Sequence, residues 1–136
     1  MRILGIDFGD SRTGFAVSDP LGFGARTLAP CKEKNMVKVA GRAAELAKEN
    51  GAELIVLGFP RNMNGSVGPR GKKTKAFAAL LEERLDIPVR LWDERLTTVS
   101  AHLLMNETNT RGQKRKDSVD SISAAYILQS YLDSLK

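Results

Sequence analysis

The first twenty residues, Met1-Arg-Ile-Leu-Gly-Ile-Asp-Phe-Gly-Asp-Ser-Arg-Thr-Gly-Phe-Ala-Val-Ser-Asp-Pro20, predict the centre of the fold. Two apolar runs, Ile3–Phe8 and Gly14–Val17, flank a polar turn that contains glycine, which is the pattern of a β-hairpin. The handedness of the crossovers further along the chain places the later strands beside the first run, so it is expected to lie in the middle of the sheet.

Asp7 lies inside the first apolar run, although aspartate is a poor strand former and is costly to bury without a partner. Two interpretations stay open. The side chain could cap the turn by accepting backbone N–H bonds from Gly9–Ser11, or it could present a metal-binding carboxylate on a rigid strand. Gly5 and Gly9 on either side would leave the backbone bare for an ion or a phosphate to approach.

Beyond the hairpin, the chain predicts helices that alternate with strands. In order we expect a strand at Thr27–Cys31, a helix at Met36–Asn50, a strand at Leu54–Gly58, a helix at Lys73–Leu85, a strand at Val89–Asp93, a helix from Thr97 or Thr98 to about Asn106, and a helix at Ser118–Leu135. This order predicts an α/β fold in one domain, residues 1–136, with a mixed five-stranded sheet in the order 3-2-1-4-5 and helices on both faces.

Composition narrows the class of protein. The net charge of +5 and the pI near 9.6 favour an anionic partner, with nucleic acid as the first candidate. Cys31 is the only cysteine, so no disulfide can form within the chain, which suits a reducing cytosol. No apolar stretch has the length of a membrane span, and Met1 leads directly into a strand without a signal peptide. We therefore expect a cytoplasmic protein without a membrane partner.

Two basic segments are candidate nucleic-acid contacts. The glycines and lysines of Gly65–Thr74 resemble those of a phosphate-binding P-loop. The segment lacks the G-x-x-x-x-G-K spacing of that motif, and Pro69 has no backbone N–H to bind a phosphate. This segment could be a solvated loop, but we favour a loop that grips a phosphate backbone through Arg61, Arg70, Lys72, Lys73 and Lys75. The second segment, Arg111–Lys116, is predicted to be a loop as well, with Lys114, Arg115 and Lys116 as contacts, although such runs are usually only solvated.

Acidic residues recur at two further places in the chain. Asp93 and Glu94 follow a parallel strand at the edge where α/β sheets bind ligands, and alternation sends them to opposite faces. An ion pair with Arg95 would explain one of them but not both. Asp117 and Asp120 share a face at the start of the last helix, where Asp117 is equally well explained as an N-cap and Asp120 should face inward.

These carboxylates predict a site for hard cations. Oxygen ligands without cysteine or histidine select Mg²⁺ or Mn²⁺ rather than zinc. Two such ions, roughly 3.5–4 Å apart, can activate water and stabilise the leaving oxygen in phosphodiester cleavage. The longer Glu94 side chain reaches across the sheet to Asp7 better than Asp93 does.

Several motifs make the chain resemble the YqgF (RuvX) family. They are Gly5-Ile-Asp7-Phe-Gly9, Gly58-Phe-Pro60, Asp93-Glu-Arg-Leu-Thr-Thr98 and Val119-Asp120-Ser-Ile-Ser-Ala-Ala125. The resemblance implies an RNase H-like fold related to RuvC Holliday-junction resolvases and a cytoplasmic nuclease that matures the 5′ end of 16S ribosomal RNA precursor. It also implies Asp7, Glu94 and Asp120 as catalytic metal ligands. The acid that resolvases carry on strand four is absent here, where the chain has Gly58.

Three alternatives stay open beside this nuclease. The nuclease would act on precursor ribosomal RNA, either free or within a ribosomal precursor particle. A Holliday-junction resolvase would act on branched DNA instead. A nucleic-acid-binding or regulatory module would keep the basic segments without catalysis. The glycine-rich first motif also resembles actin-like ATPases and sugar kinases, which need two such domains around a nucleotide.

Overall fold

The computed structural model describes residues 1–22, 24–60, 64–94 and 112–135, and for residues 112–120 it describes the backbone only. The elements are β1 (Ile3–Asp7), β2 (Thr13–Ser18), β3 (Ala25–Cys31), α1 (Met36–Glu49), β4 (Leu54–Phe59), α2 (Pro69–Arg84), β5 (Val89–Asp93) and α4 (Gly112–Ser134). They follow the predicted order. The helix expected between Thr97 and Asn106 lies outside the described residues.

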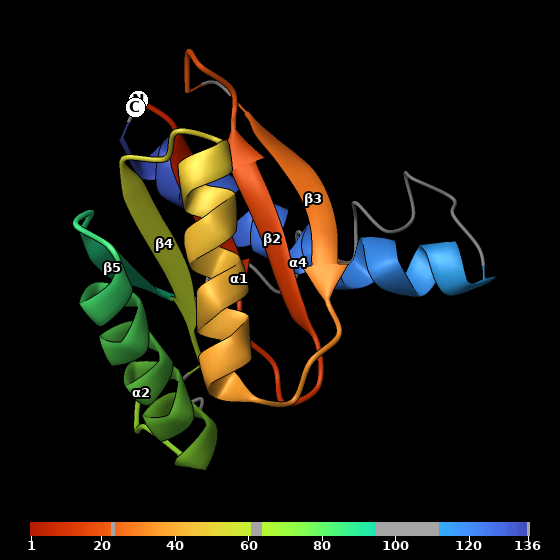
Figure 1. Ribbon diagram of the computed structural model, residues 1–136, viewed down its shortest axis with the longest axis vertical. Coiled ribbons are helices and arrows are strands. Elements are labelled where there is room, and N and C mark those ends of the chain that lie inside the picture. The colour runs from red at the N-terminus through yellow and green to blue at the C-terminus, as the bar shows by residue number, and fades with distance from the viewer. Residues whose placement is uncertain (23, 61–63, 95–111, 136) are drawn as a thin grey trace.

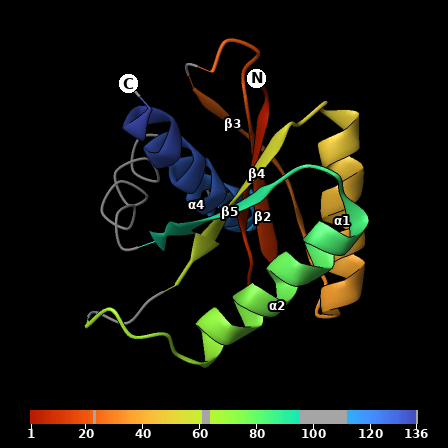
Figure 2. The same cartoon turned by 90° about the vertical axis from the view of Figure 1, so that its left-hand side faces the viewer.

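The five strands form one mixed sheet in the order β3-β2-β1-β4-β5, which confirms the predicted sheet (Figure 1). β2 pairs antiparallel with β1 and with β3, whereas β4 runs parallel to both β1 and β5. In Figure 2 the sheet is seen nearly edge-on, with α1 and α2 over one face and α4 over the other. Asp7 therefore ends the central strand, as the sequence predicts.

The alternation of side chains along β1 divides the core into two parts. Leu4 and Ile6 pack with α1 and α2, whereas Ile3 packs with α4. All six residues of β4 are buried, so the prediction of a strand covered on both faces is confirmed. These two cores determine, at the C-terminal end of each strand, which side chains point toward α4 and which point toward α2.

The interpretation of Gly5 and Gly9 as bare backbone for a ligand is wrong. A Cβ on Gly5 would lie 2.8 Å from Leu128 Cβ and 3.0 Å from the carbonyl oxygen of Ala124. A Cβ on Gly9 would collide with the carbonyl oxygen of Arg12, across the turn. The protein itself fills the space beside both glycines: α4 crosses β1 at Gly5, and the hairpin closes tightly at Gly9.

Two helices begin earlier than predicted. α2 starts at Pro69 rather than at Lys73, because proline suits the first helical position, where its missing N–H is not needed. α4 starts at Gly112, so the predicted loop Arg111–Lys116 is helical from Gly112 onward. Figure 1 shows these first turns of α4, in light blue, extending past β3. Turns beyond the sheet need no apolar periodicity, so the pattern that revealed the rest of the helix is missing there.

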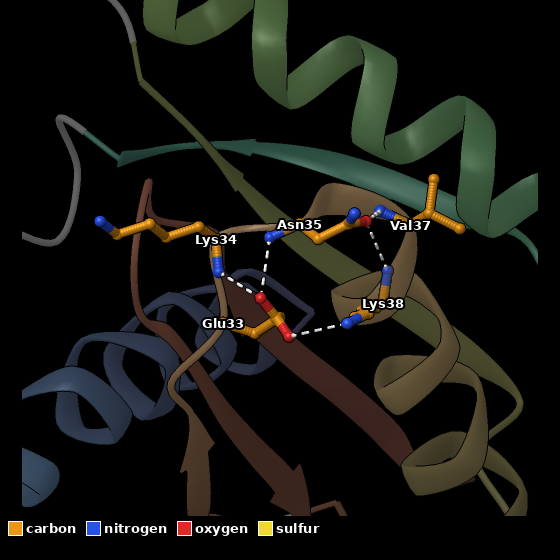
Figure 3. Close-up of polar contacts among 5 residues, drawn as sticks. All are labelled: Glu33, Lys34, Asn35, Val37 and Lys38. Atoms are coloured by element: carbon orange, nitrogen blue, oxygen red, sulfur yellow. Dashed lines mark hydrogen bonds and ion pairs between the residues drawn. The ribbon is translucent and has the colours of Figure 1, made fainter.

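A set of polar contacts organises the start of α1 (Figure 3). The Asn35 side chain accepts backbone N–H bonds from Val37 and Lys38 at 3.0 and 3.2 Å, as an N-cap does. The Glu33 carboxylate accepts backbone N–H bonds from Lys34 and Asn35 at 2.8 and 3.1 Å. These bonds from Asn35 and Lys34, together with the nearby Lys38 ammonium, lower the pKa of Glu33 below its ordinary value of 4.5.

This lowered pKa predicts a pH-dependent contribution to stability. Because the folded protein favours ionised Glu33, the stabilisation is complete above about pH 4.5 and is lost as the pH falls through the lowered pKa. Glu33→Gln should be less stable than the unmodified chain at about pH 7, with a difference that shrinks toward about pH 3. Urea unfolding at both pH values measures this difference, and a constant difference would contradict the assignment.

Candidate functional site

Asp7 lies half-buried at the end of β1, on the face of the sheet that α4 covers. Its orientation follows from Ile3 and Gly5, the alternate positions of the same strand, which both contact α4. On one side Asp7 is paired with Gly14 of β2. On the other side the register of Ile6 with Leu57 brings Gly58 of β4 next to Asp7, at the usual strand spacing of about 4.8 Å.

Gly58 provides the space in which Glu94 lies. A Cβ at position 58 would be 2.7 Å from Glu94 Oε1 and 3.1 Å from Glu94 Cγ, and it would also collide with Ile127 Cδ1. Glu94 follows β5 directly, so its side chain extends from the edge strand across β4 on the α4 face. The carboxylate is therefore above the residue that neighbours Asp7, and both acids are at the same edge of the sheet.

Asp93 takes the opposite direction. It is in register with Phe59 and lines a cavity of about 410 Å³ together with Phe59, Val67, Lys75 and Leu91, on the face of the sheet that α2 covers. The two consecutive acids thus leave β5 on different faces, as alternation along the strand predicts. Of the two, it is Glu94 that lies on the same face as Asp7.

α4 brings a third acidic position toward this edge through its backbone. The helix contacts successive strands: Ser121 Oγ donates to the Leu28 carbonyl of β3, Ala124 lies against Gly5 of β1, and Ile127 lies against Gly58 of β4. Asp120 precedes Ala124 by one helical turn. The side chains of Asp120 and Asp117 lie outside the described residues, and among the described side chains no group of three acids, histidines or cysteines could hold an ion.

The predicted basic contacts divide into two sets. Arg70, Lys72 and Lys73 are exposed on the first turns of α2, and Lys73 Nζ is 3.5 Å from Oδ1 of Asp10 in the β1–β2 turn. Arg61 lies outside the described residues. The first turns of α4 contain Lys114, Arg115 and Lys116, whose backbone is described but whose side chains are not.

Gly58 is the position whose part in the candidate site the sequence did not reveal. The resemblance to the family marks it only as the place where resolvases carry an acid. The available signal was a glycine inside a strand of otherwise large apolar residues, which often marks a site of close approach. The partner of that approach, Glu94, comes from another strand, so its identity needed the three-dimensional structure.

A mixed 3-2-1-4-5 sheet, helices on both faces and carboxylates at the C-terminal ends of β1 and β5 define a protein of the RNase H-like class. Solved structures support this fold. The chain matches the Thermus thermophilus RuvC complex with a Holliday junction substrate at TM-score 0.66 and 13% identity, covering 99% of this chain and 95% of that one. The Fowlpox virus resolvase complex with Holliday junction DNA matches at TM-score 0.63 and 13% identity, covering 99% of both chains.

The chain belongs to the RuvX family, whose model, described as Holliday junction resolvase, matches residues 1–134. A Clostridium novyi protein named "Putative pre-16S rRNA nuclease" is 48% identical, over 99% of this chain and 100% of that protein. An Acetivibrio thermocellus protein of the same name is 52% identical, over 98% of this chain and 96% of that protein. These findings confirm the predicted family and the predicted class of enzyme, a nuclease that hydrolyses phosphodiester bonds.

The class of nuclease suggests that activity depends on divalent metal ions and that the partner is nucleic acid. Asp7 and Glu94 suit such ions, because carboxylate oxygens are the ligands that hard cations prefer. None of the described helices combines the length and the apolar character that a membrane span requires.

The space beside Gly58 generates a prediction. In Gly58→Ala the new methyl group must displace Ile127 Cδ1 and the Glu94 carboxylate. We expect a stability loss of about 1–3 kcal/mol from overpacking and, in folded protein, a strong loss of metal-dependent cleavage. The double variant Gly58→Ala/Glu94→Gln should cleave no more slowly than Glu94→Gln, because both changes remove the same interaction.

Gly41→Ala is the matched control for this prediction. Gly41 lies within α1, and a Cβ there would have no neighbour within 4 Å. The substitution should raise stability by about 0.5–1 kcal/mol and leave cleavage unchanged. Additive losses in the double variant at position 58 would show that Gly58 acts independently of Glu94.

Proposed function

We propose that this protein is a divalent-metal-dependent nuclease that hydrolyses phosphodiester bonds at the 5′ end of 16S ribosomal RNA precursor. Asp7, Glu94 and Asp120 are the proposed catalytic metal ligands. The observation that carries the proposal is the course of Glu94 across Gly58, which brings its carboxylate over the neighbour of Asp7. The relatives named as pre-16S rRNA nucleases support RNA as the substrate.

The described residues fit a bound Mg²⁺ or Mn²⁺ in their chemistry and in their setting. When bound, a pair of such ions supplies an activated water and stabilises the leaving oxygen. The chain holds Asp7 on the central strand, and Ile127 packs beside Glu94 against the bare backbone of Gly58. These neighbours limit the motion of the two carboxylates, so that they are preorganised for the ions and the substrate phosphate.

Acting on branched DNA is the second candidate, because the family model is described as a Holliday junction resolvase. A cleavage panel separates the candidates: precursor ribosomal RNA, single-stranded RNA and four-way DNA junctions, each with Mg²⁺ and with Mn²⁺. We expect metal-dependent cleavage of RNA. Preference for the junction would overturn the proposed substrate, and cleavage of none of them would favour a binding module.

The proposed ligands predict a graded series of variants. Asp7→Asn, Glu94→Gln and Asp120→Asn should keep the fold and lower cleavage by about a hundredfold or more, above the 10- to 100-fold typical of groups that only orient ligands. Asp117→Asn should cost much less. Single-turnover cleavage with saturating substrate measures the series, and circular dichroism checks the fold.

Two results would reverse assignments within this series. Equal losses at Asp117 and Asp120 would show that the acidic pair on α4 is wrongly assigned. Inactive Asp93→Asn beside active Glu94→Gln would exchange the roles of the two consecutive acids, in conflict with their observed faces.

The basic residues predict a loss of binding rather than of chemistry. Neutralising Lys114, Arg115 and Lys116 should weaken binding across sequences and reduce the slope of log K against log salt by about 2–3 units, at about 0.7–0.9 per lost phosphate contact. Neutralising Arg70, Lys72 and Lys73 tests the other set in the same way. Cleavage at saturating substrate should fall far less than binding in both triple variants.

The double variant Lys48→Gln/Arg84→Gln is the control for these charges. Both residues are exposed in the last turns of α1 and α2, at the end of the sheet away from Asp7 and Glu94. It should leave the salt slope nearly unchanged. An unchanged slope in the α4 triple variant would assign the contact surface to the α2 side alone.

A further inference from the structure

We propose that the cavity between α2 and β5 binds one ribonucleotide of the substrate strand, with Asp93 accepting a hydrogen bond from its 2′-hydroxyl group. Lys75 would hold the adjoining phosphate. The proposal rests on the proposed function, since it concerns the same nucleic-acid strand that Asp7 and Glu94 would cleave. It adds the means by which this protein would tell RNA from DNA.

The cavity has the size of a ligand site. Its volume of about 410 Å³ falls within the range of about 300–1,000 Å³ that small-molecule sites occupy. Val67 and the exposed Leu91 supply apolar walls, and Phe59 supplies an aromatic one. Lys75 Nζ lies 5.6 Å from the centroid of the Phe59 ring. Among the described residues, one cation and one carboxylate therefore face this space, whose lining combines polar with apolar atoms.

The carboxylate determines which ligand fits. A nucleic acid brings negative charge to a cavity that Asp93 lines, so a ligand group that donates a hydrogen bond to this carboxylate fits better than one that only accepts. An ionised carboxylate only accepts hydrogen bonds, and the 2′-hydroxyl group is a donor that RNA has and DNA lacks. Lys75 in the same cavity can pair with the neighbouring phosphate and offset the charge of Asp93. This combination suits a ribonucleotide better than a deoxyribonucleotide.

The position of the cavity connects it with the proposed catalytic residues. Asp93 and Glu94 are consecutive, and they leave the end of β5 on opposite faces. A strand that passes around this edge of the sheet can meet Glu94 on one face and Asp93 on the other. Exposed Arg70 and Lys72 follow on the first turns of α2, which lies alongside β5 at the edge of the sheet (Figure 1).

Binding in EDTA tests the proposal without cleavage. Dissociation constants are measured by fluorescence anisotropy for one sequence prepared as RNA, as DNA and as 2′-O-methyl RNA, which keeps the oxygen but removes the donor. The unmodified protein should bind RNA at least about tenfold more tightly than either analogue, as one hydrogen bond to a charged group allows. Asp93→Ala should reduce both ratios to near one.

Three variants complete the test. Asp93→Asn keeps the shape without the charge and should lose most of the preference; it decides the matter if Asp93→Ala does not fold. Lys75→Gln should weaken binding of all three oligonucleotides alike and lower the salt slope by about 0.7. Asp86→Ala removes an exposed acid between α2 and β5 that does not line the cavity, and it should keep the preference.

Equal binding of the three oligonucleotides by the unmodified protein, or an RNA preference that survives the Asp93 substitutions, would overturn the proposal. Its failure can be told from that of the nuclease proposal. Cleavage that needs Glu94 without an Asp93-dependent preference would overturn this inference alone. An Asp93-dependent preference without metal-dependent cleavage would overturn the nuclease proposal alone.

Discussion

The direct contact of α4 with the backbone of the sheet is the constraint on which the candidate site depends. At Gly5 and Gly58 no side chain separates the helix from β1 and β4, so Leu128 and Ile127 pack directly against the strands. Close contact of this kind gains dispersion energy and excludes water. It also fixes the height of the helix above the sheet, and with it the depth of the space where the Glu94 carboxylate lies. A larger residue at either glycine would alter packing and site together.

The fold uses the two faces of one strand end for different purposes. Because successive side chains alternate, Asp93 and Glu94 are adjacent in the chain but separated by the sheet. The α4 face is closed by Ile127 and Trp92, and Trp92 Nε1 donates to Ser130 Oγ at 3.1 Å while its ring meets Tyr131 edge-on. The α2 face is open beside Leu91, which is 38% exposed. The closed face thus carries the proposed metal-binding carboxylate, Glu94, and the open face offers room for a ligand.

Much of the fold was predictable from sequence because it follows from local patterns. The hairpin, the doubly buried β4 and the sheet order come from apolar runs and from the handedness of crossovers. The first turns of α4 were not predictable by periodicity, since they extend past the sheet, where no apolar stripe is needed. Asp7 and Glu94 could be named as candidates from residue type and position. The prediction that Gly5 and Gly9 leave the backbone bare for a ligand was wrong. Glycine shows that a close approach occurs but not whether the partner is a ligand or the protein itself.

The place of the second carboxylate explains why a strand-four acid can be absent without loss of the site. An acid on β4 would project from position 58 itself, whereas Glu94 reaches the same space from β5. The glutamate side chain, one methylene longer than that of aspartate, spans the distance between neighbouring strands, about 4.8 Å, better than an aspartate would. The two arrangements exclude one another, because a side chain at position 58 would occupy the space of the Glu94 carboxylate. A glycine on β4 and a glutamate after β5 therefore depend on one another, and a change at either one alone would leave the proposed site without its second acid.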